Sequence, residues 1–295
     1  MPLPSGLVAY LHQPQFSFMV KFQLELLFHI IGIGSASGLI YKGDSVFVIS
    51  DSSNALFEYN IKTQALEKTS LDGNPTTDNI PKKTKADYEA MANYGDDFYI
   101  FGSGSTPNRN KMVQVNTQTQ TMKTVDLSYL YSLMQSFGNI TPQDFNIEGV
   151  VFTGEQWYFL QRGNGQSAQN GIFTVNGKNL ENDFTILYNQ YKLPKIKSVR
   201  SSFTDAVLVD GQLYFLACAE DSASTYEDGQ VLGSLIGSVD LETMKIGKTL
   251  QVSNQHKFEG LTLYQNSAHQ LEFLLCEDND TQVLESNIYK LSVRK

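Results

Sequence analysis

Cysteine is scarce in this sequence, with two residues in a chain of 295. Two cysteines cannot form the disulfide framework on which small secreted domains depend. Both lie in apolar runs, at 216–218 and 274–276. We therefore expect two buried thiols and a reducing, cytoplasmic location.

Long apolar stretches and an excess of basic charge are also missing. No apolar run is long enough for a membrane-spanning helix, and residues 1–18 lack the basic start of a secretory signal. The chain carries 22 Lys+Arg against 31 Asp+Glu, a formal net charge of −9, which opposes binding to nucleic-acid phosphates. We expect neither nucleic acid nor membrane as a partner, an N-terminal extension at 1–18, and a single domain at 19–295.

What the sequence does contain is a short repeat, in which an acid, an apolar strand, a glycine turn and a second apolar strand follow one another. Three copies begin at Glu89, Glu148 and Asp205, each with a glycine six residues later. A fourth copy begins at Ser37 in place of the acid, and a fifth, at Glu259, has a longer turn. The copies recur every 52 to 59 residues, which is enough for four strands each.

Five four-stranded units at this spacing predict an all-β fold, a five-bladed β-propeller of antiparallel blades. The fifth unit runs out of chain before its outer strand. The alternating run 22–28 is expected to supply that strand by pairing with residues 287–293, which closes the ring and removes an exposed edge. Six blades, with one unit hidden in a connection, is the alternative. We expect a monomer.

The connection between the second and third units has the apolar pattern of a short helix. Ser128 is expected as its N-cap and Gly138 as its stop. The expected role of this helix is to cover a gap between two blades. The residues predicted to share its apolar face are Tyr129, Leu130, Leu133, Met134 and Phe137.

The repeated acids are the candidate functional residues, because the inner strand of each blade lines the central channel. Oxygen donors that converge at one mouth suit a hard cation, Ca²⁺ or alternatively Mg²⁺. The structural alternative is that each carboxylate accepts hydrogen bonds from backbone amides of the neighbouring blade. The predicted metal ligands are Glu89, Glu148, Asp205 and Glu259, and the residues expected on the rim are Asp51, Glu220, Glu277 and Asp278.

Arg162 is a cation among these acids, fourteen residues after Glu148 and therefore at the same end of the hairpin. Its guanidinium is expected either to pair with Glu148 or to hold an anionic substrate group. Arg109 and Arg200 belong to connections on the same side and would strengthen the second role if they converged. His256, three residues before Glu259, is the candidate general base among the histidines.

The segments 147–150 (IEGV) and 258–261 (FEGL), each followed by an aromatic-rich strand, resemble the inner-strand motif of phytase-esterase-like propellers. They are more distantly similar to the gluconolactonase and regucalcin type. Within the first group the chain is similar to uncharacterised bacterial proteins. The resemblance implies a divalent-metal site built from central acids, with ligands at Glu148 and Glu259.

Two functions follow from these residues as alternatives. In the first, a cation polarises a lactone, ester or phosphoester oxygen, Glu148 activates water and Arg162 orients the substrate. In the second, the same mouth and the acidic connection 219–233 bind a small-molecule ligand or a protein without catalysis.

Overall fold

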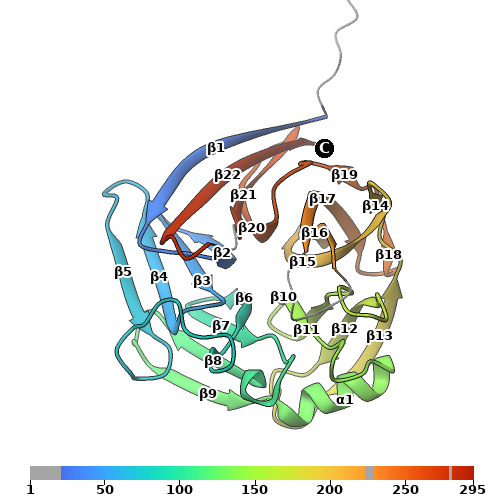
Figure 1. Cartoon of the computed structure of the whole chain (residues 1–295), viewed down its shortest axis with the longest axis horizontal. Helices are drawn as coiled ribbons and strands as arrows, with labels where there is room; N and C mark the ends of the chain where they lie inside the picture. The colour runs from blue at the N-terminus through green and yellow to red at the C-terminus, as the bar shows by residue number, and fades with distance from the viewer. Residues whose placement is uncertain (1–20, 223–228, 279–280) are drawn as a thin grey trace, which may run out of the picture.

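Five antiparallel sheets surround a common axis in the computed structural model, which describes residues 21–222, 229–278 and 281–295 (Figure 1). The predicted five-bladed β-propeller is thus confirmed. The expected extension at 1–18 lies outside the described residues. The innermost strands of neighbouring blades contact one another around the whole ring.

The first three blades each contain four strands in the order of the chain, innermost first. Blade 1 contains β2 (Ala36–Lys42), β3 (Ser45–Ser50), β4 (Ala55–Asn60) and β5 (Leu66–Ser70). Blade 2 contains β6 (Tyr88–Tyr94), β7 (Asp97–Gly102), β8 (Lys111–Asn116) and β9 (Met122–Asp126). Blade 3 contains β10 (Ile147–Phe152), β11 (Gln156–Gln161), β12 (Asn170–Asn176) and β13 (Thr185–Tyr191).

Blade 4 has an outer strand that is divided in two. It contains β14 (Lys195–Ile196), β15 (Val199–Val209), β16 (Gln212–Asp221), β17 (Gln230–Asp240), β18 (Lys245–Ile246) and β19 (Leu250–Gln251). The two-residue strand β14 pairs with the start of the inner strand β15, and β18 and β19 both pair with β17.

Blade 5 joins the two ends of the chain. It contains β20 (Phe258–Asn266), β21 (Gln270–Glu277), β22 (Glu285–Arg294) and, as its outer strand, β1 (Phe22–Ile31). The register of β1 on β22 runs from Phe22 opposite Val293 to Ile31 opposite Glu285, with a bulge at Leu27. The predicted closure by the N-terminal strand is therefore present, and Figure 1 shows β1 alongside β22.

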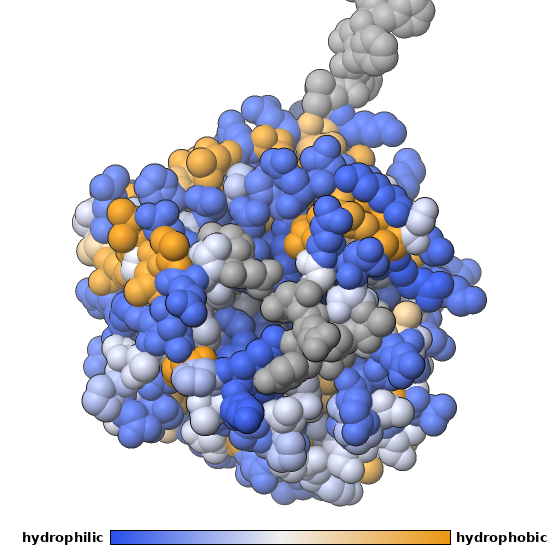
Figure 2. Space-filling model, in the orientation of Figure 1, coloured by the Kyte–Doolittle hydropathy of each residue, from blue (hydrophilic) through white to orange (hydrophobic). Residues whose placement is uncertain are grey.

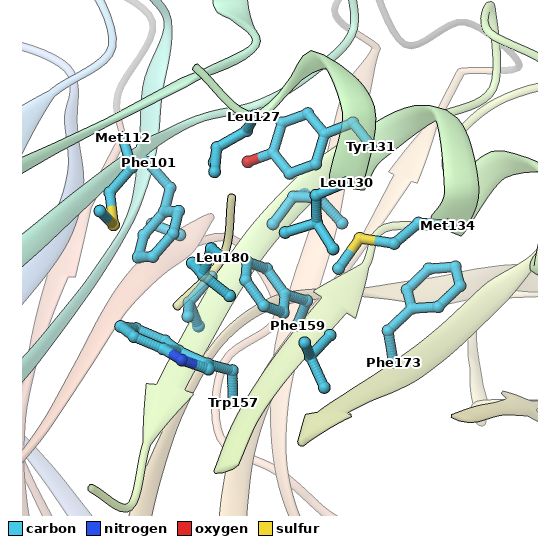
Figure 3. Packing of buried hydrophobic residues seen from close by; sticks show 14 of the residues in the cluster. Phe101, Met112, Leu127, Leu130, Tyr131, Met134, Trp157, Phe159, Phe173 and Leu180 are labelled. Carbon is cyan, nitrogen blue, oxygen red and sulfur yellow. The ribbon is translucent and has the colours of Figure 1, made fainter. Parts of the chain in front are cut away.

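The hydrophobic core consists of six clusters. Five of them lie between two neighbouring blades, and the small sixth cluster lies within blade 4. Both faces of the inner part of each blade are therefore covered, which explains why the inner strands read as apolar runs. Between blades 2 and 3, for example, Phe101 of β7 packs against Trp157 and Phe159 of β11, with ring centroids 5.7 and 5.4 Å apart (Figure 3).

The predicted helix is α1 (Ser128–Gly138), and it covers this same cluster with Leu130, Tyr131 and Met134 (Figure 3). Two details of the prediction were wrong. Ser128 is the first helical residue rather than the cap, and Tyr129 and Phe137 are exposed, because the buried face is centred one residue later. No helix in the described part of the chain has the length and apolar character needed to cross a membrane.

Both cysteines are buried free thiols, as expected. Burial raises the pKa of Cys218 to about 12 and also raises that of Cys276. Neither thiol therefore has the lowered pKa that marks a reactive cysteine.

Candidate functional site

A β-bulge recurs near the start of every inner strand. At this position in each blade, one residue of the inner strand has no partner on the next strand, so that two residues of the inner strand lie opposite one residue of its neighbour. Bulges redirect a side chain, and here they act at the same end of five adjacent strands. The bulged residues are Ser37, Glu89, Glu148, Thr204 and Glu259.

This register corrects our alignment of the fourth repeat by one residue. Thr204, not Asp205, is the equivalent of the three glutamates. The hydroxyl of Ser37 donates to the carbonyl of Tyr88 at 2.5 Å, and the hydroxyl of Thr204 donates to the carbonyl of Phe258 at 2.7 Å. Each of these carbonyls belongs to the residue before the next blade's glutamate, so the two hydroxyls make the same link.

The misalignment arises from the turn that we used as a marker. In blades 1 and 2 the glycine with positive φ, Gly43 or Gly95, comes first in the turn. In blade 4 the first turn position is held by Asp210 at φ 50°, and Gly211 follows it. Asparagine and aspartate are the residues other than glycine that best tolerate this conformation. Because Gly211 is second in its turn, counting back six residues from it leads to Asp205 instead of Thr204.

Asp205 consequently has a structural environment. Its Oδ1 accepts a hydrogen bond from the amide of Ala206 at 2.7 Å, and its Oδ2 accepts one from the amide of Leu261, in blade 5, at 2.6 Å. This is the inter-blade arrangement that the sequence left open as the alternative to a metal ligand. The same strand position is held by a small residue in each of the other blades.

Arg162 contacts three carboxylates. Its Nη1 lies 3.0 Å from Oε1 of Glu148 and 3.4 Å from Oε1 of Glu259, and its Nη2 lies 2.7 Å from Oε2 of Glu220. All four side chains are buried. The expected pair with Glu148 is thus present, together with two bonds to other blades. Buried charges require such compensation, since each loses its hydration.

Two lysines that the sequence analysis missed also occupy this end of the ring. The ammonium of Lys257 lies 3.2 Å from Oε1 of Glu259 and 2.9 Å from Oδ2 of Asp278. The ammonium of Lys85 contacts Asp51 and lies 2.8 Å from Oδ1 of Asp87. These lysines therefore offset part of the negative charge that we predicted for the mouth.

A signal for these residues was present in the sequence. Asp87, Asn146 and Lys257 each stand two residues before a bulged glutamate. Alternate residues of a strand share one face, so a polar residue at this spacing indicates a neighbour of the glutamate. Asn146 donates from Nδ2 to Oε1 of Glu148 at 2.6 Å, which follows this pattern.

The three arginines do not converge on an open site. Arg109, in the 3₁₀ turn η1 (Pro107–Arg109), donates from Nη1 to Oδ2 of Asp87 at 2.6 Å. Ser103 donates to the same oxygen at 2.5 Å. Arg109 and Arg162 are thus both buried against carboxylates, whereas Arg200 is exposed.

Glu89 differs from the other two bulged glutamates. Within the described residues it has no hydrogen bond and no ion pair within 4 Å, and its side chain is half-buried. One of its carboxyl oxygens forms a group with oxygens of Asp51 and Asp87, all within 4.8 Å of one another. Burial raises the pKa of Glu89 well above its ordinary value, and the charges of Asp87 and Glu148 raise it further.

The remaining predicted residues divide between the mouth and blade 5. Asp51, Glu220 and Asp278 join the charged network at the mouth, as expected for the rim. Glu277 instead pairs with His256, with 2.6 Å between its Oε1 and the Nδ1 of His256. The His256 ring stacks on Phe258 at 5.3 Å, so packing as well as this bond holds it.

Hydrophilic residues gather around the centre of the ring when the molecule is viewed along its axis (Figure 2). The charged network described above belongs to the ends of the inner strands that meet there. It contains the cations Lys85, Arg109, Arg162 and Lys257 and the acids Asp51, Asp87, Glu89, Glu148, Glu220, Glu259 and Asp278.

Residues 32–293 match the family of unknown function DUF6929. The chain belongs to this family. The match begins just before β2 and ends within β22, so it includes every inner strand of the ring. No curated protein matches the chain in sequence.

Two solved structures share the fold of this DUF6929 member. Glutaminyl cyclase of Myxococcus xanthus is 10% identical, with a TM-score of 0.53, over 92% of this chain and 97% of that chain. An exo-1,5-α-L-arabinanase from a bovine ruminal metagenomic library is 7% identical, with a TM-score of 0.51, over 90% and 96%. These likenesses support the propeller fold. The closer relationship to phytase-esterase-like or gluconolactonase propellers stays a prediction.

Proposed function

We propose that the charged mouth of the ring is a hydrolytic site in which Glu89 transfers a proton. The observation that carries this proposal is the contrast between Glu89 and its equivalents. Glu148 and Glu259 are held by Arg162 and Lys257, whereas Glu89 is half-buried and forms no ion pair within the described residues. A carboxyl with a raised pKa next to paired carboxylates has the properties of a general acid.

The neighbours of Glu89 supply the complementary charges. Asp87 lies 2.8 Å from the ammonium of Lys85 and accepts hydrogen bonds from Arg109 and Ser103, and these contacts fix its position. An ionised carboxylate beside a protonated one is the pairing used for acid–base hydrolysis. In this proposal Glu89 protonates the leaving group, and Asp87 or Asp51 orients the attacking water and accepts its proton.

Glu148 and Arg162, the catalytic residues expected from the sequence, take a positioning role in this proposal. The Arg162 guanidinium already contacts three carboxylates, so it is not free to hold an anionic substrate group without losing one of them. Neutral or cationic substrates therefore suit this mouth better than anionic ones. Lactones and neutral esters remain the first choice, ahead of phosphoesters.

The two enzymes that share the fold support a catalytic interpretation only in general. A glutaminyl cyclase and an arabinanase have comparable rings. Fold similarity alone does not transfer a reaction. It does justify adding a peptide with N-terminal glutamine and an aryl arabinofuranoside to the substrates that should be tested.

The test is an activity assay over lactones, aryl esters and phosphoesters together with those two substrates, with and without Ca²⁺. For a substrate that turns over, Glu89→Gln is expected to reduce kcat about 10²- to 10⁴-fold. Glu67→Gln, at an exposed position of β5, is the matched control. Equal activity of wild type and Glu89→Gln would reject the role of Glu89, and absence of turnover would favour a ligand-binding propeller.

Binding of a divalent cation is the second candidate function, and one observation favours it. Carboxyl oxygens of Asp51, Asp87 and Glu89 lie within 4.8 Å of one another, a spacing that one oxygen-liganded ion can bridge. Ca²⁺ suits such a site better than Mg²⁺, because it accepts irregular geometry. The ammonium of Lys85 already contacts Asp51 and Asp87, so an ion must displace it.

This candidate is tested by melting the protein with Ca²⁺, with Mg²⁺ and with chelator. Binding to the folded state alone raises the melting temperature by mass action. Glu89→Gln should abolish the increase, and Lys85→Met should enlarge it by removing the competing ammonium. A melting temperature that is indifferent to all three additions contradicts the metal site.

A further inference from the structure

A concave site lies at the opposite end of the inner strands from the charged mouth, between blades 2 and 3. It has a volume of about 370 Å³. Tyr94 and Gly154 mark its position beside the β6–β7 and β10–β11 turns, whereas the bulges lie at the other ends of these strands. Glu89 and Tyr94 are five residues apart on β6, roughly 16 Å along a strand. The site is therefore distinct from the charged mouth.

The walls of this cleft are aromatic. Phe152 stacks on Trp157 with centroids 3.8 Å apart, and Tyr99 meets Trp157 edge-on at 5.0 Å. Tyr94 forms the rim: its ring is half exposed and lies 5.5 Å from that of Phe152. Leu180 and Met112 also line the cleft and add aliphatic surface, and Figure 3 shows Leu180 next to Trp157. Such a lining suits an apolar ring.

One polar atom of a lining residue has no hydrogen-bond partner in the described part of the chain. The indole Nε1–H of Trp157 is buried and donates a hydrogen bond to no described residue, and Trp157 as a whole is 1% exposed. A buried donor without a partner is costly and calls for an acceptor from water or a ligand. This observation is independent of the shape of the cleft.

The charges at the opening favour an anion. Lys123 and Lys178 line the cleft with a single acid, Glu181. Lys123 pairs with Glu181 at 2.8 Å, and Lys178 pairs at 2.9 Å with Glu155, which does not line the cleft. Both pairs are exposed, so each is weak and open to competition by a carboxylate.

We propose that this cleft binds a small molecule with an aromatic ring and a carboxylate. The ring lies against Tyr94 and Phe152, and the carboxylate lies toward Lys178 and Lys123. The site is separate from the hydrolytic mouth, and neither its occupation nor its loss depends on the function proposed there.

The test uses the only tryptophan of the chain as its reporter, since Trp157 lines the cleft. Titration with 3-phenylpropionate is expected to give a saturable change in Trp157 fluorescence. Calorimetry should give the same dissociation constant. The neutral analogue 3-phenylpropionamide should bind about threefold to fivefold more weakly, the size of an exposed charge interaction. A change that does not saturate at millimolar ligand, or equal binding of acid and amide, overturns the proposal.

Variants then locate the site. Tyr94→Ala should abolish saturable binding, whereas Tyr129→Ala, at an exposed tyrosine of α1, should bind as wild type. Lys178→Gln should lower the affinity for 3-phenylpropionate to that for 3-phenylpropionamide. Its control is Lys62→Gln, which alters a comparably exposed lysine paired with Asp44 at 2.8 Å. If a variant and its control lost the same affinity for 3-phenylpropionate, binding would lie elsewhere and the cleft would be rejected as the site.

Discussion

Arg162 of blade 3 donates through its two terminal nitrogens to Glu148 of its own blade and Glu220 of blade 4, at 3.0 and 2.7 Å. A third contact, at 3.4 Å, reaches Glu259 of blade 5. One side chain thus holds the charged ends of three blades together. The same contacts leave it little freedom to act as a substrate anchor.

Replacement of Arg162 by methionine is expected to destabilise the protein by about 3–5 kcal/mol. The change leaves Glu148, Glu220 and Glu259 buried with less compensation, and that is more costly than the loss of the ion pairs themselves. Urea unfolding measures the difference in the free energy of unfolding. Arg200→Met, at an exposed arginine, is the control and should stay within about 0.5 kcal/mol of wild type.

Glu89→Gln is expected to make the protein more stable than wild type at neutral pH. Because burial raises the folded-state pKa of Glu89, the folded protein holds this proton more tightly than the unfolded chain. The stability from this group is fully present below the unfolded pKa of about 4.3, and it is lost as pH rises toward the folded value. Glutamine remains neutral, so the variant avoids that loss.

The measurement for this prediction is urea unfolding of both proteins across the pH range from about 4 to 8. The gain in free energy of unfolding of Glu89→Gln over wild type should be absent at the acidic limit and should grow as pH rises. Glu67→Gln is the matched control, because Glu67 is exposed. A constant difference between wild type and Glu89→Gln at all pH values would show that the gain does not come from titration of this carboxyl.

Asp205→Asn is expected to cost about 1–3 kcal/mol, since one of two buried backbone amides loses its acceptor. If Asp205 has only this structural role, the response of the melting temperature to Ca²⁺ should equal that of wild type. Asp210→Asn, at an exposed turn position that asparagine also tolerates, should change neither quantity. If wild type responded to Ca²⁺ and the melting temperature of Asp205→Asn did not, Asp205 would be a metal ligand after all.

Ser37→Ala and Thr204→Val should each lower the free energy of unfolding by about 1 kcal/mol. Each change removes one hydroxyl bond to the next blade, at 2.5 and 2.7 Å respectively. Since the bonds lie in different blade interfaces, the double variant should show the sum within about 0.5 kcal/mol. A large effect from one change and none from the other would contradict their equivalence.

The fold was accessible from the sequence because the repeat is local. Strand, glycine turn and strand follow one another within each copy. The number of copies gives the number of blades, and their spacing gives the number of strands in each. Closure by β1 was also accessible, because the last unit visibly lacked an outer strand. The exception was blade 4, where Asp210 accepts a conformation that we had assigned to glycine, and the alignment moved by one residue.

The site was less accessible, because it depends on contacts between blades. The repeat places Glu220 and Glu259, which lie 58 and 97 residues from Arg162, at the same mouth, but it does not indicate that Arg162 contacts both. Lys85 precedes its repeat by four residues, outside the pattern that we aligned. Similarity between copies identifies what the blades share, whereas the chemistry of the mouth depends on where they differ.

The pairing of Phe22 with Val293 has a consequence for biosynthesis. Strand β1 leaves the ribosome first, yet its partner β22 leaves last, so the ring cannot close until translation of the domain is nearly complete. Until then β1 and the blades that have already formed present unpaired strand edges, and such edges promote aggregation. Joining the ends also requires a contact across almost the entire chain, and such distant contacts slow folding. Ring closure is therefore the step at which a chaperone would have the greatest effect on yield.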